Sequence, residues 1–198
     1  EITPRVKRLH RLAERVKNRT RVTIREADFN RWDQEVDAVY ALLNRCLSHL
    51  DDSIGWRRDN LETMLAPFQK IADPAMILFA EIENEVVGFL PGVPNMNEVF
   101  DRVNGLRYPW NYLQLAWLAR SHSFRGLSVK SVLVLPEYWN RGVAVMLFSE
   151  LFQRALARGY QWADLSLTSL DNPSSVLTAE KLGAAIYKRW QVYHLPLD

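Results

Sequence analysis

An apolar run that leads through a turn directly into a helix is the feature that most limits how this chain can fold. Val132–Leu135 has the composition of a strand, Pro136 and Gly142 follow, and an apolar helical pattern begins near Val143. The first N–H groups of a helix have no intrahelical acceptor, and the helix dipole favours negative charge at that end. Gly142 allows close approach to the backbone, and Ala144 is nearly as small. The segment therefore predicts a site where main-chain groups bind an anion such as phosphate.

Two sequence blocks resemble motifs of the GCN5-related N-acetyltransferase (GNAT) superfamily. The first, Trp139-Asn140-Arg141-Gly142-Val143-Ala144, fits the Gln/Arg-x-x-Gly-x-Gly/Ala turn that follows a Val-x-Pro strand, with Trp139 in place of Gln or Arg. The second joins Asn172-Pro173-Ser174-Ser175 to Glu180-Lys181-Leu182-Gly183-Ala184, and it fits the Asn-containing loop and the Glu-Lys-Leu-Gly-Phe helix end. The resemblance covers residues 127–195. Within the superfamily, the chain is similar to a little-characterised bacterial branch whose members have longer N-termini.

The resemblance implies an α/β (α+β) fold with a mixed central sheet of about six to seven strands flanked by helices. In this fold the fourth and fifth strands splay apart, and the pantetheine arm of acetyl-coenzyme A lies in the gap. The implied reaction transfers acetyl, or another acyl group, from this co-substrate to an amine by direct attack on the thioester. Carried over by position, the coenzyme A contacts are Leu133, Val134 and Leu135 on the arm, Asn140, Arg141, Gly142, Val143 and Ala144 on the pyrophosphate, and Asn172 and Ser175 in the later loop. Asn172 also fits a turn before Pro173 with no ligand role.

The usual catalytic side chains of the superfamily are missing from their usual positions. Lys130 lies in the stretch where many members carry a base Glu, and Ala179 stands where many carry an acid Tyr. We name Glu81 as a substitute base and Tyr187, or Tyr138, as a substitute acid. The alternative for Glu81 is a surface carboxylate on a hairpin, and the alternative for Tyr187 is a strand residue that packs on its neighbours. The absence of the usual pair also supports a second hypothesis, a coenzyme A binding sensor or scaffold without catalysis.

Composition describes an ordinary globular chain of 198 residues, with 48% hydrophobic and 24% charged residues. The sequence contains no apolar run of about 18 residues, so we expect no membrane span and a cytoplasmic location. A single cysteine, Cys46, cannot form an internal disulfide and fits a small core residue. Four scattered histidines lack metal-ligand spacing, and we expect no metal. The chain begins at Glu1, and a missing N-terminal region remains an open alternative.

Basic residues concentrate at the N-terminus, where residues 1–25 hold nine Lys or Arg against two Glu. They interleave with apolar residues at helical spacing, which predicts a basic amphipathic helix over residues 1–19. Binding to nucleic acid or to a membrane surface is one interpretation. A solvated basic face is favoured because no aromatic residues for base stacking accompany the charges.

The resemblance implies one GNAT domain over residues 20–198, and hydrophobic periodicity predicts its elements. Expected strands cover residues 20–25, 76–82, 85–90, 129–135, 161–168 and 185–195, and expected helices cover 31–50, 58–68, 141–158 and 174–182. A helical insertion over about 92–126 contains helices at 94–103 and 110–121.

The insertion carries Trp110, Tyr112 and Trp117, which suggest a partly apolar acceptor or acyl chain; helix packing is the equally weighted alternative. We expect a small-molecule amine or peptide acceptor, a homodimer as one option, no membrane partner, and no nucleic-acid partner.

Overall fold

The computed structural model describes residues 4–17, 19–48, 55–103, 107–120, 124–168, 173–191, 193 and 195. These residues belong to two compact units, Glu1–Ser166 and Leu167–Asp198. None of the helices in the described ranges has the length and hydropathy required to span a bilayer.

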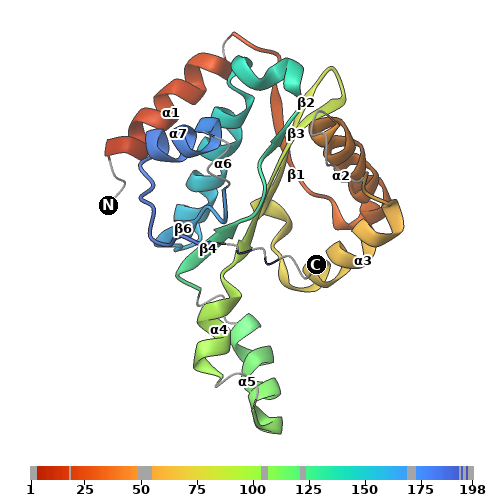
Figure 1. Ribbon diagram of the computed structural model, residues 1–198, viewed down its shortest axis with the longest axis vertical. Helices are drawn as coiled ribbons and strands as arrows, with labels where there is room; N and C mark the ends of the chain where they lie inside the picture. Colours follow the sequence, from red (N-terminus) through yellow and green to blue (C-terminus); the bar gives the residue numbers. More distant parts are fainter. Residues whose placement is uncertain are drawn as a thin grey trace. The chain divides into compact units, whose positions relative to one another are not determined.

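A mixed sheet forms the centre of the first unit (Figure 1). Its strands are β1 (Thr23–Glu26), β2 (Ile77–Ile82), β3 (Glu85–Pro94), β4 (Gly126–Val129), β5 (Leu133–Val134) and β6 (Trp162–Asp164). Neighbours follow the order β1-β2-β3-β4-β6, and β5 also pairs with β3. The pairings are antiparallel except for β4 with β6, which is parallel. The predicted mixed sheet flanked by helices is confirmed.

Helices cover both faces of this sheet (Figure 1). On one face lie α1 (Pro4–Lys17) and α6 (Val143–Ala157), and on the other lie α2 (Trp32–Leu47) and α3 (Arg58–Ile71). The sequence of α6 explains its position, because its buried residues recur at helical spacing and present one apolar stripe to the sheet. Those buried residues include Val143, Met146, Leu147, Leu151 and Ala155. The helix ends before Gly159, whose φ of 84° lies in the left-handed region that glycine tolerates.

The basic helix α1 packs along α6 within the first unit. Leu9 and Ala13 on its apolar stripe are buried, whereas the Lys and Arg side chains described on α1 are exposed. A polar contact lies beside the stripe, where His10 Nδ1 is 2.6 Å from Gln153 Nε2. The predicted division of the chain into a basic helix over 1–19 and a domain over 20–198 remains a prediction.

The expected fourth strand is divided. Residues 129–135 were predicted to be continuous, but β4 ends at Val129 and β5 begins at Leu133. Between them, the Lys130 N–H still donates to the Pro91 carbonyl at 3.2 Å. The fifth strand, β6, pairs with β4 only as far as Ser128 and Asp164. Backbone pairing between the two strands therefore ends at Ser128, in agreement with the expected splay, and beyond it the Ser166 hydroxyl donates to the Val129 carbonyl at 2.7 Å.

The predicted last strand at 185–195 is wrong for the described residues, since residues 184–191, 193 and 195 contain no strand. Alternating apolar residues satisfy the strand pattern, but a strand also requires a hydrogen-bonded neighbour. This segment and α7 (Pro173–Leu182) belong to the second unit, Leu167–Asp198.

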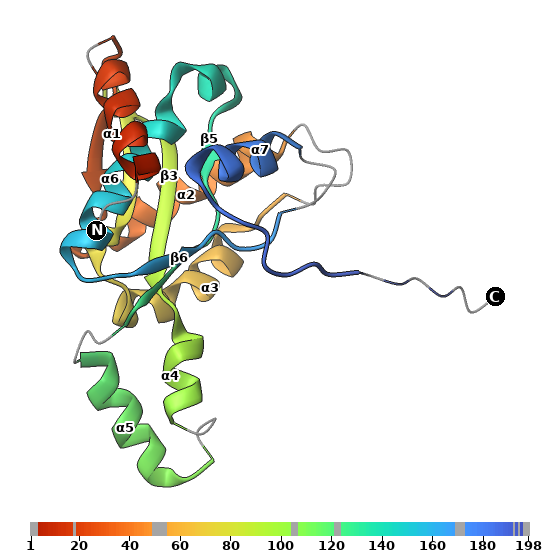
Figure 2. The same cartoon turned by 90° about the vertical axis from the view of Figure 1, so that its left-hand side faces the viewer.

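The predicted helical insertion is present between β3 and β4. It consists of α4 (Met96–Arg102) and α5 (Pro109–Arg120), which lie side by side beyond the ends of these strands (Figure 2). Val103 and Phe124 form a small buried cluster, against which Met96, Leu115 and Tyr160 pack. The aromatic residues Trp110 and Trp117 on α5 are exposed.

Candidate functional site

The predicted anion site is a turn between β5 and α6. Residues Pro136–Arg141 form a 3-10 turn, and Gly142 has a φ of 79°, a left-handed conformation that favours glycine. The Met146 N–H donates to the Gly142 carbonyl at 3.1 Å, so the first turn of α6 begins at Gly142. The N–H groups of Val143 and Ala144 lie in this first turn, where a helix leaves its donors without intrahelical acceptors. Asn140 and Arg141 are exposed beside them.

Gly142 is closely approached by the protein itself. A Cβ atom at this position would lie 2.6 Å from Cγ2 of Val16 on α1. The predicted close approach at Gly142 is therefore made by an apolar side chain of the basic helix. Val16 occupies the space next to Gly142, so a ligand at this turn would bind to the main-chain N–H groups and would not contact the Cα side of Gly142.

The edge of β5 that faces away from β3 is the second part of the site. The Leu135 N–H donates to the Val87 carbonyl at 3.0 Å, so Leu135 directs its main-chain groups toward β3. Main-chain groups alternate in direction along a strand, and those of Val134 therefore face the opposite edge. Among the described residues, β3 is the only strand that pairs with β5. The edge of β5 that faces away from β3 thus carries the main-chain groups of Val134.

Trp139 makes a contact that the sequence did not reveal. Its indole Nε1 donates to the Val134 carbonyl at 2.7 Å, and the Cys46 thiol donates to the same oxygen at 3.4 Å. The residue that replaces the Gln or Arg of the motif thus caps a main-chain group of the predicted pantetheine strand. Burial raises the pKa of the Cys46 thiol, which disfavours the thiolate.

The turn is tied to helix α2 by Arg45. Its guanidinium donates to Glu85 on β3 at 2.7 Å and to Glu137 in the turn at 2.6 Å. These side chains are about half exposed, so the two ion pairs contribute little to stability but restrict the turn's orientation. Arg141 lies over Tyr138, with 5.1 Å from its Cζ to the ring centroid.

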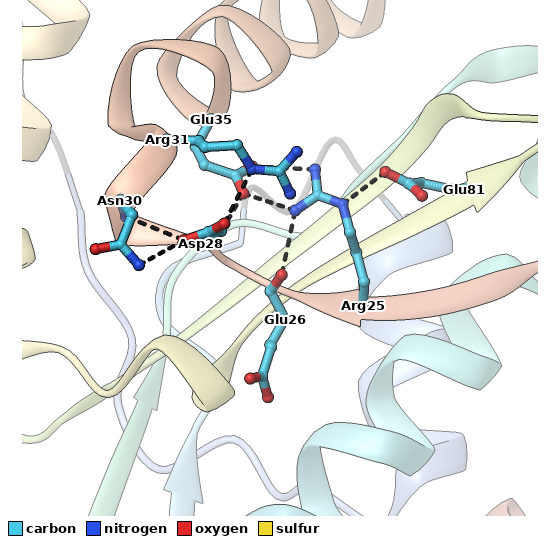
Figure 3. A network of polar contacts seen from close by, with 7 residues as sticks. All are labelled: Arg25, Glu26, Asp28, Asn30, Arg31, Glu35 and Glu81. Atoms are coloured by element: carbon cyan, nitrogen blue, oxygen red, sulfur yellow. Dashed lines mark hydrogen bonds and ion pairs between the residues drawn. The ribbon is translucent and has the colours of Figure 1, made fainter.

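Glu81, the predicted base, is bound in an ion pair. Its Oε1 accepts from Arg25 Nε at 2.6 Å, and Arg25 also donates to both carboxylate oxygens of Glu35, at 2.7 and 3.0 Å (Figure 3). Glu35 is buried and accepts a further bond from the Asp28 N–H at 2.8 Å. Partial burial opposes the charge of Arg25, but its carboxylate partners outweigh that effect and raise its pKa. The network holds Glu81 toward Arg25.

The remaining predicted residues are less informative. Tyr187 lies in the second unit, where Lys188 Nζ is 5.4 Å from its ring centroid. Asn172 is outside the described residues, and Ser175 contributes only a described helical backbone. In the described ranges no group of His, Cys, Asp and Glu residues is arranged to hold a metal ion.

Comparison with known proteins gives the following matches. The family model described as Acetyltransferase (GNAT) family matches residues 36–184. Two curated relatives are a bacterial ceramide synthase of Caulobacter vibrioides (22% identical over 180 residues) and protein YghO of Escherichia coli (26% over 179 residues). They cover 89% and 88% of this chain, which spans about half of their length, 47% and 46%. An aminoglycoside N-acetyltransferase, AAC(6')-Iy, solved with coenzyme A, has the same fold with a TM-score of 0.56 and 19% identity, covering 88% of this chain and 94% of its own.

Proposed function

The chain belongs to the acetyltransferase (GNAT) family, whose general activity is acetyl transfer from acyl-coenzyme A, and we propose that it acylates an amine by direct attack on the thioester. The observation that carries this proposal is that β5, whose Val134 edge faces away from β3, leads through the turn Pro136–Arg141 into the first turn of α6. The strand edge offers the Val134 N–H to an extended arm, and the turn offers N–H donors to a pyrophosphate.

Each predicted contact has a place in this proposal. Leu133, Val134 and Leu135 follow the pantetheine arm, and the backbone from Asn140 to Ala144 follows the pyrophosphate. Arg141 adds an exposed guanidinium that suits a phosphate oxygen. Asn172 and Ser175 stay predictions from the family motif. The predicted domain division, a basic helix over 1–19 and an acyltransferase domain over 20–198, is proposed on the same grounds.

Positioning accounts for the chemistry without a strong base. A thioester is already activated, and an amine held close to its carbonyl carbon reacts as if at a high local concentration. Glu81 as base would first have to separate from Arg25, an ion pair with an N–O distance of 2.6 Å. Tyr187 and Tyr138 remain predicted acids for the departing thiolate. We therefore assign the acceleration to orientation of the two reactants.

A coenzyme A sensor without catalysis is the second candidate. Trp139 and Cys46 already bond to the Val134 carbonyl, which is the group that a pantetheine amide would approach. Lys130 and Ala179 replace the usual catalytic side chains as well. Such a protein would bind coenzyme A and release no thiol.

One experiment separates the two candidates. Thermal unfolding is measured with free coenzyme A, and thiol release is then followed with acetyl-coenzyme A and a panel of amines. The panel includes an aminoglycoside and a lipid amine, since the names of the relatives suggest these acceptor classes. Stabilisation together with amine-dependent thiol release supports the enzyme, and stabilisation without release supports the sensor.

The location of the site needs a variant of its own. Arg141→Glu places a negative charge beside the proposed pyrophosphate, so we expect about tenfold weaker coenzyme A binding. Arg102→Glu is the matched control, because Arg102 is an exposed arginine on α4 at the other end of β3. Equal affinities of the two variants would contradict the placement of the pyrophosphate.

A further inference from the structure

An apolar cavity of about 440 Å³, partly open to solvent, lies between the sheet and the helix pair α2 and α3. Its walls come from α2, α3, β2, β3 and the segment between β4 and β5. The lining residues used below are Val39, Leu65, Phe89, Lys130, Ser131 and Leu133. Further aromatic side chains, including Trp56 and Phe68, complete an almost entirely apolar wall.

Close packing does not account for a space of this size. Protein interiors are packed as densely as organic crystals, with few voids larger than a water molecule. Pockets that bind small molecules typically measure about 300–1,000 Å³. The carboxylate of Glu35 reaches the wall, but its charge is paired with Arg25 and the Asp28 N–H. The cavity therefore suits an uncharged apolar ligand.

The cavity meets the proposed thioester path where the sheet opens. Lys130 and Ser131, which lie in the break between β4 and β5, are exposed and line the cavity. An arm that starts from a pyrophosphate at Gly142 and follows β5 runs from Leu135 toward Leu133, because β5 precedes the turn. Its far end, which carries the thioester, therefore arrives at Ser131. The acyl group on that thioester is then at the mouth of the cavity.

We infer that this cavity holds the hydrocarbon chain of a long-chain acyl-coenzyme A, so that the transferred group is a fatty acyl group. The inference rests on the proposed function and adds the class of donor. In the reaction the amine nitrogen forms a bond to the thioester carbonyl carbon, and the carbon–sulfur bond breaks. The amine loses a proton, the thiolate of coenzyme A gains one, and no oxidant or reductant takes part.

Binding measurements test the inference without a known acceptor. Dissociation constants are measured by calorimetry for free coenzyme A and for its acetyl, octanoyl and palmitoyl thioesters. Burial of each methylene is favourable, so the palmitoyl thioester is expected to bind at least about tenfold more tightly than the acetyl thioester. Free palmitate is measured in parallel.

Two variants fill the cavity from different helices. Val39→Phe adds a ring from α2, and Leu65→Trp adds an indole from α3. Each is expected to remove the advantage of the palmitoyl thioester and to leave the affinity for free coenzyme A unchanged, which also verifies folding. Ala66→Trp is the control, because Ala66 is an exposed neighbour that does not line the cavity. This control should bind all four compounds like the original protein.

The outcomes separate the inference from the proposed function. Equal affinity for acetyl and palmitoyl thioesters, with normal coenzyme A binding, contradicts the inference alone. If the palmitoyl thioester keeps its higher affinity in both filling variants, the acyl chain binds elsewhere and the inference is contradicted. A loss of free coenzyme A binding in both filling variants also contradicts the inference. If filling changes amine preference and leaves chain-length preference intact, the cavity is the acceptor site. Absence of coenzyme A binding overturns the proposed function, even where palmitate binds.

Discussion

The two faces of the central sheet are packed differently. On the α6 face, a Cβ added to Gly88 would lie 3.1 Å from Val143 and 3.2 Å from Leu147, and one added to Gly92 would lie 2.9 Å from Leu151. On the α2 and α3 face, the same strands border a cavity of about 440 Å³. The glycines on β3 let α6 approach the sheet closely, and this packing holds the position of α6, which starts at the Gly142 turn. The opposite face retains a cavity, so the sheet separates a closely packed face from the proposed binding volume.

The largest expected effect concerns stability of the close-packed face. Leu147→Ala removes a fully buried side chain that contacts the sheet, and we expect a loss of about 2–5 kcal/mol in the free energy of unfolding. Leu65→Ala, on the cavity face, removes a half-buried side chain beside existing space and should cost about 1 kcal/mol. Urea unfolding of both variants measures the difference. Equal losses would show that the two faces are packed alike.

A smaller effect is expected at the start of α6. Gly142→Ala introduces a Cβ at positive φ and into contact with Val16, so it should cost more than the roughly 1–2 kcal/mol of left-handed strain. Gly159→Ala is a matched control, because Gly159 has a φ of 84° and open space at its Cβ position. Adding Val16→Ala to Gly142→Ala should remove the part of the stability loss that comes from the contact with Val16. The part that comes from left-handed backbone strain should remain. Urea unfolding gives all of these values, and identical losses at both glycines would contradict the contact with α1.

The Trp139 contact predicts a moderate change in ligand affinity. Trp139→Phe removes the indole N–H, so that only the longer bond from the Cys46 thiol remains on the Val134 carbonyl and a pantetheine amide can donate to this oxygen. One hydrogen bond of this kind corresponds to about a twofold to tenfold tighter dissociation constant for coenzyme A, measured by calorimetry. Trp117→Phe, an exposed tryptophan on α5, is the control. Weaker binding in Trp139→Phe would indicate that the indole contacts the ligand directly.

The smallest expected effect is a pH dependence from Cys46. Its folded-state pKa is raised by burial, so the unfolded chain ionises first as the pH rises above the ordinary thiol range. The stabilising contribution is complete below the unfolded pKa and is lost as the pH rises toward the folded one. Stability should therefore decline less steeply above about pH 9 in Cys46→Ala than in the original protein. Urea midpoints at neutral and alkaline pH provide the measurement, and identical slopes would contradict it.

Local patterns predicted much of the fold. The stripe of α6 and its end at Gly159 follow from helical periodicity and from the left-handed preference of glycine. The strands predicted over 76–82 and 85–90 leave Glu83-Asn84 as their connection, and both residues have positive φ, as a tight two-residue turn requires. The turn at Gly142 was predicted for the same local reasons.

The remaining features depend on contacts between distant segments. The break between β4 and β5 depends on which strands lie on either side, and the apolar sequence through Val129–Leu135 shows no interruption except Lys130 and Ser131. Apolar residues that line the cavity have the same periodicity as residues that fill a core. The bond from Trp139 to Val134 and the approach of Val16 to Gly142 require three-dimensional placement. The pairing of Glu81 with Arg25 likewise depends on the neighbouring strand β1.

Arg45 gives the site a thermodynamic coupling. It bonds at once to Glu137 in the turn and to Glu85 on β3, and it is carried by α2, which also borders the cavity. A ligand that shifts α2 therefore changes the free energy of the turn, and a ligand at the turn changes the free energy of α2 by the same amount. The acyl chain and the pyrophosphate of the ligand are thus expected to bind cooperatively. Because these ion pairs are exposed to solvent, this cooperativity should weaken as the ionic strength rises.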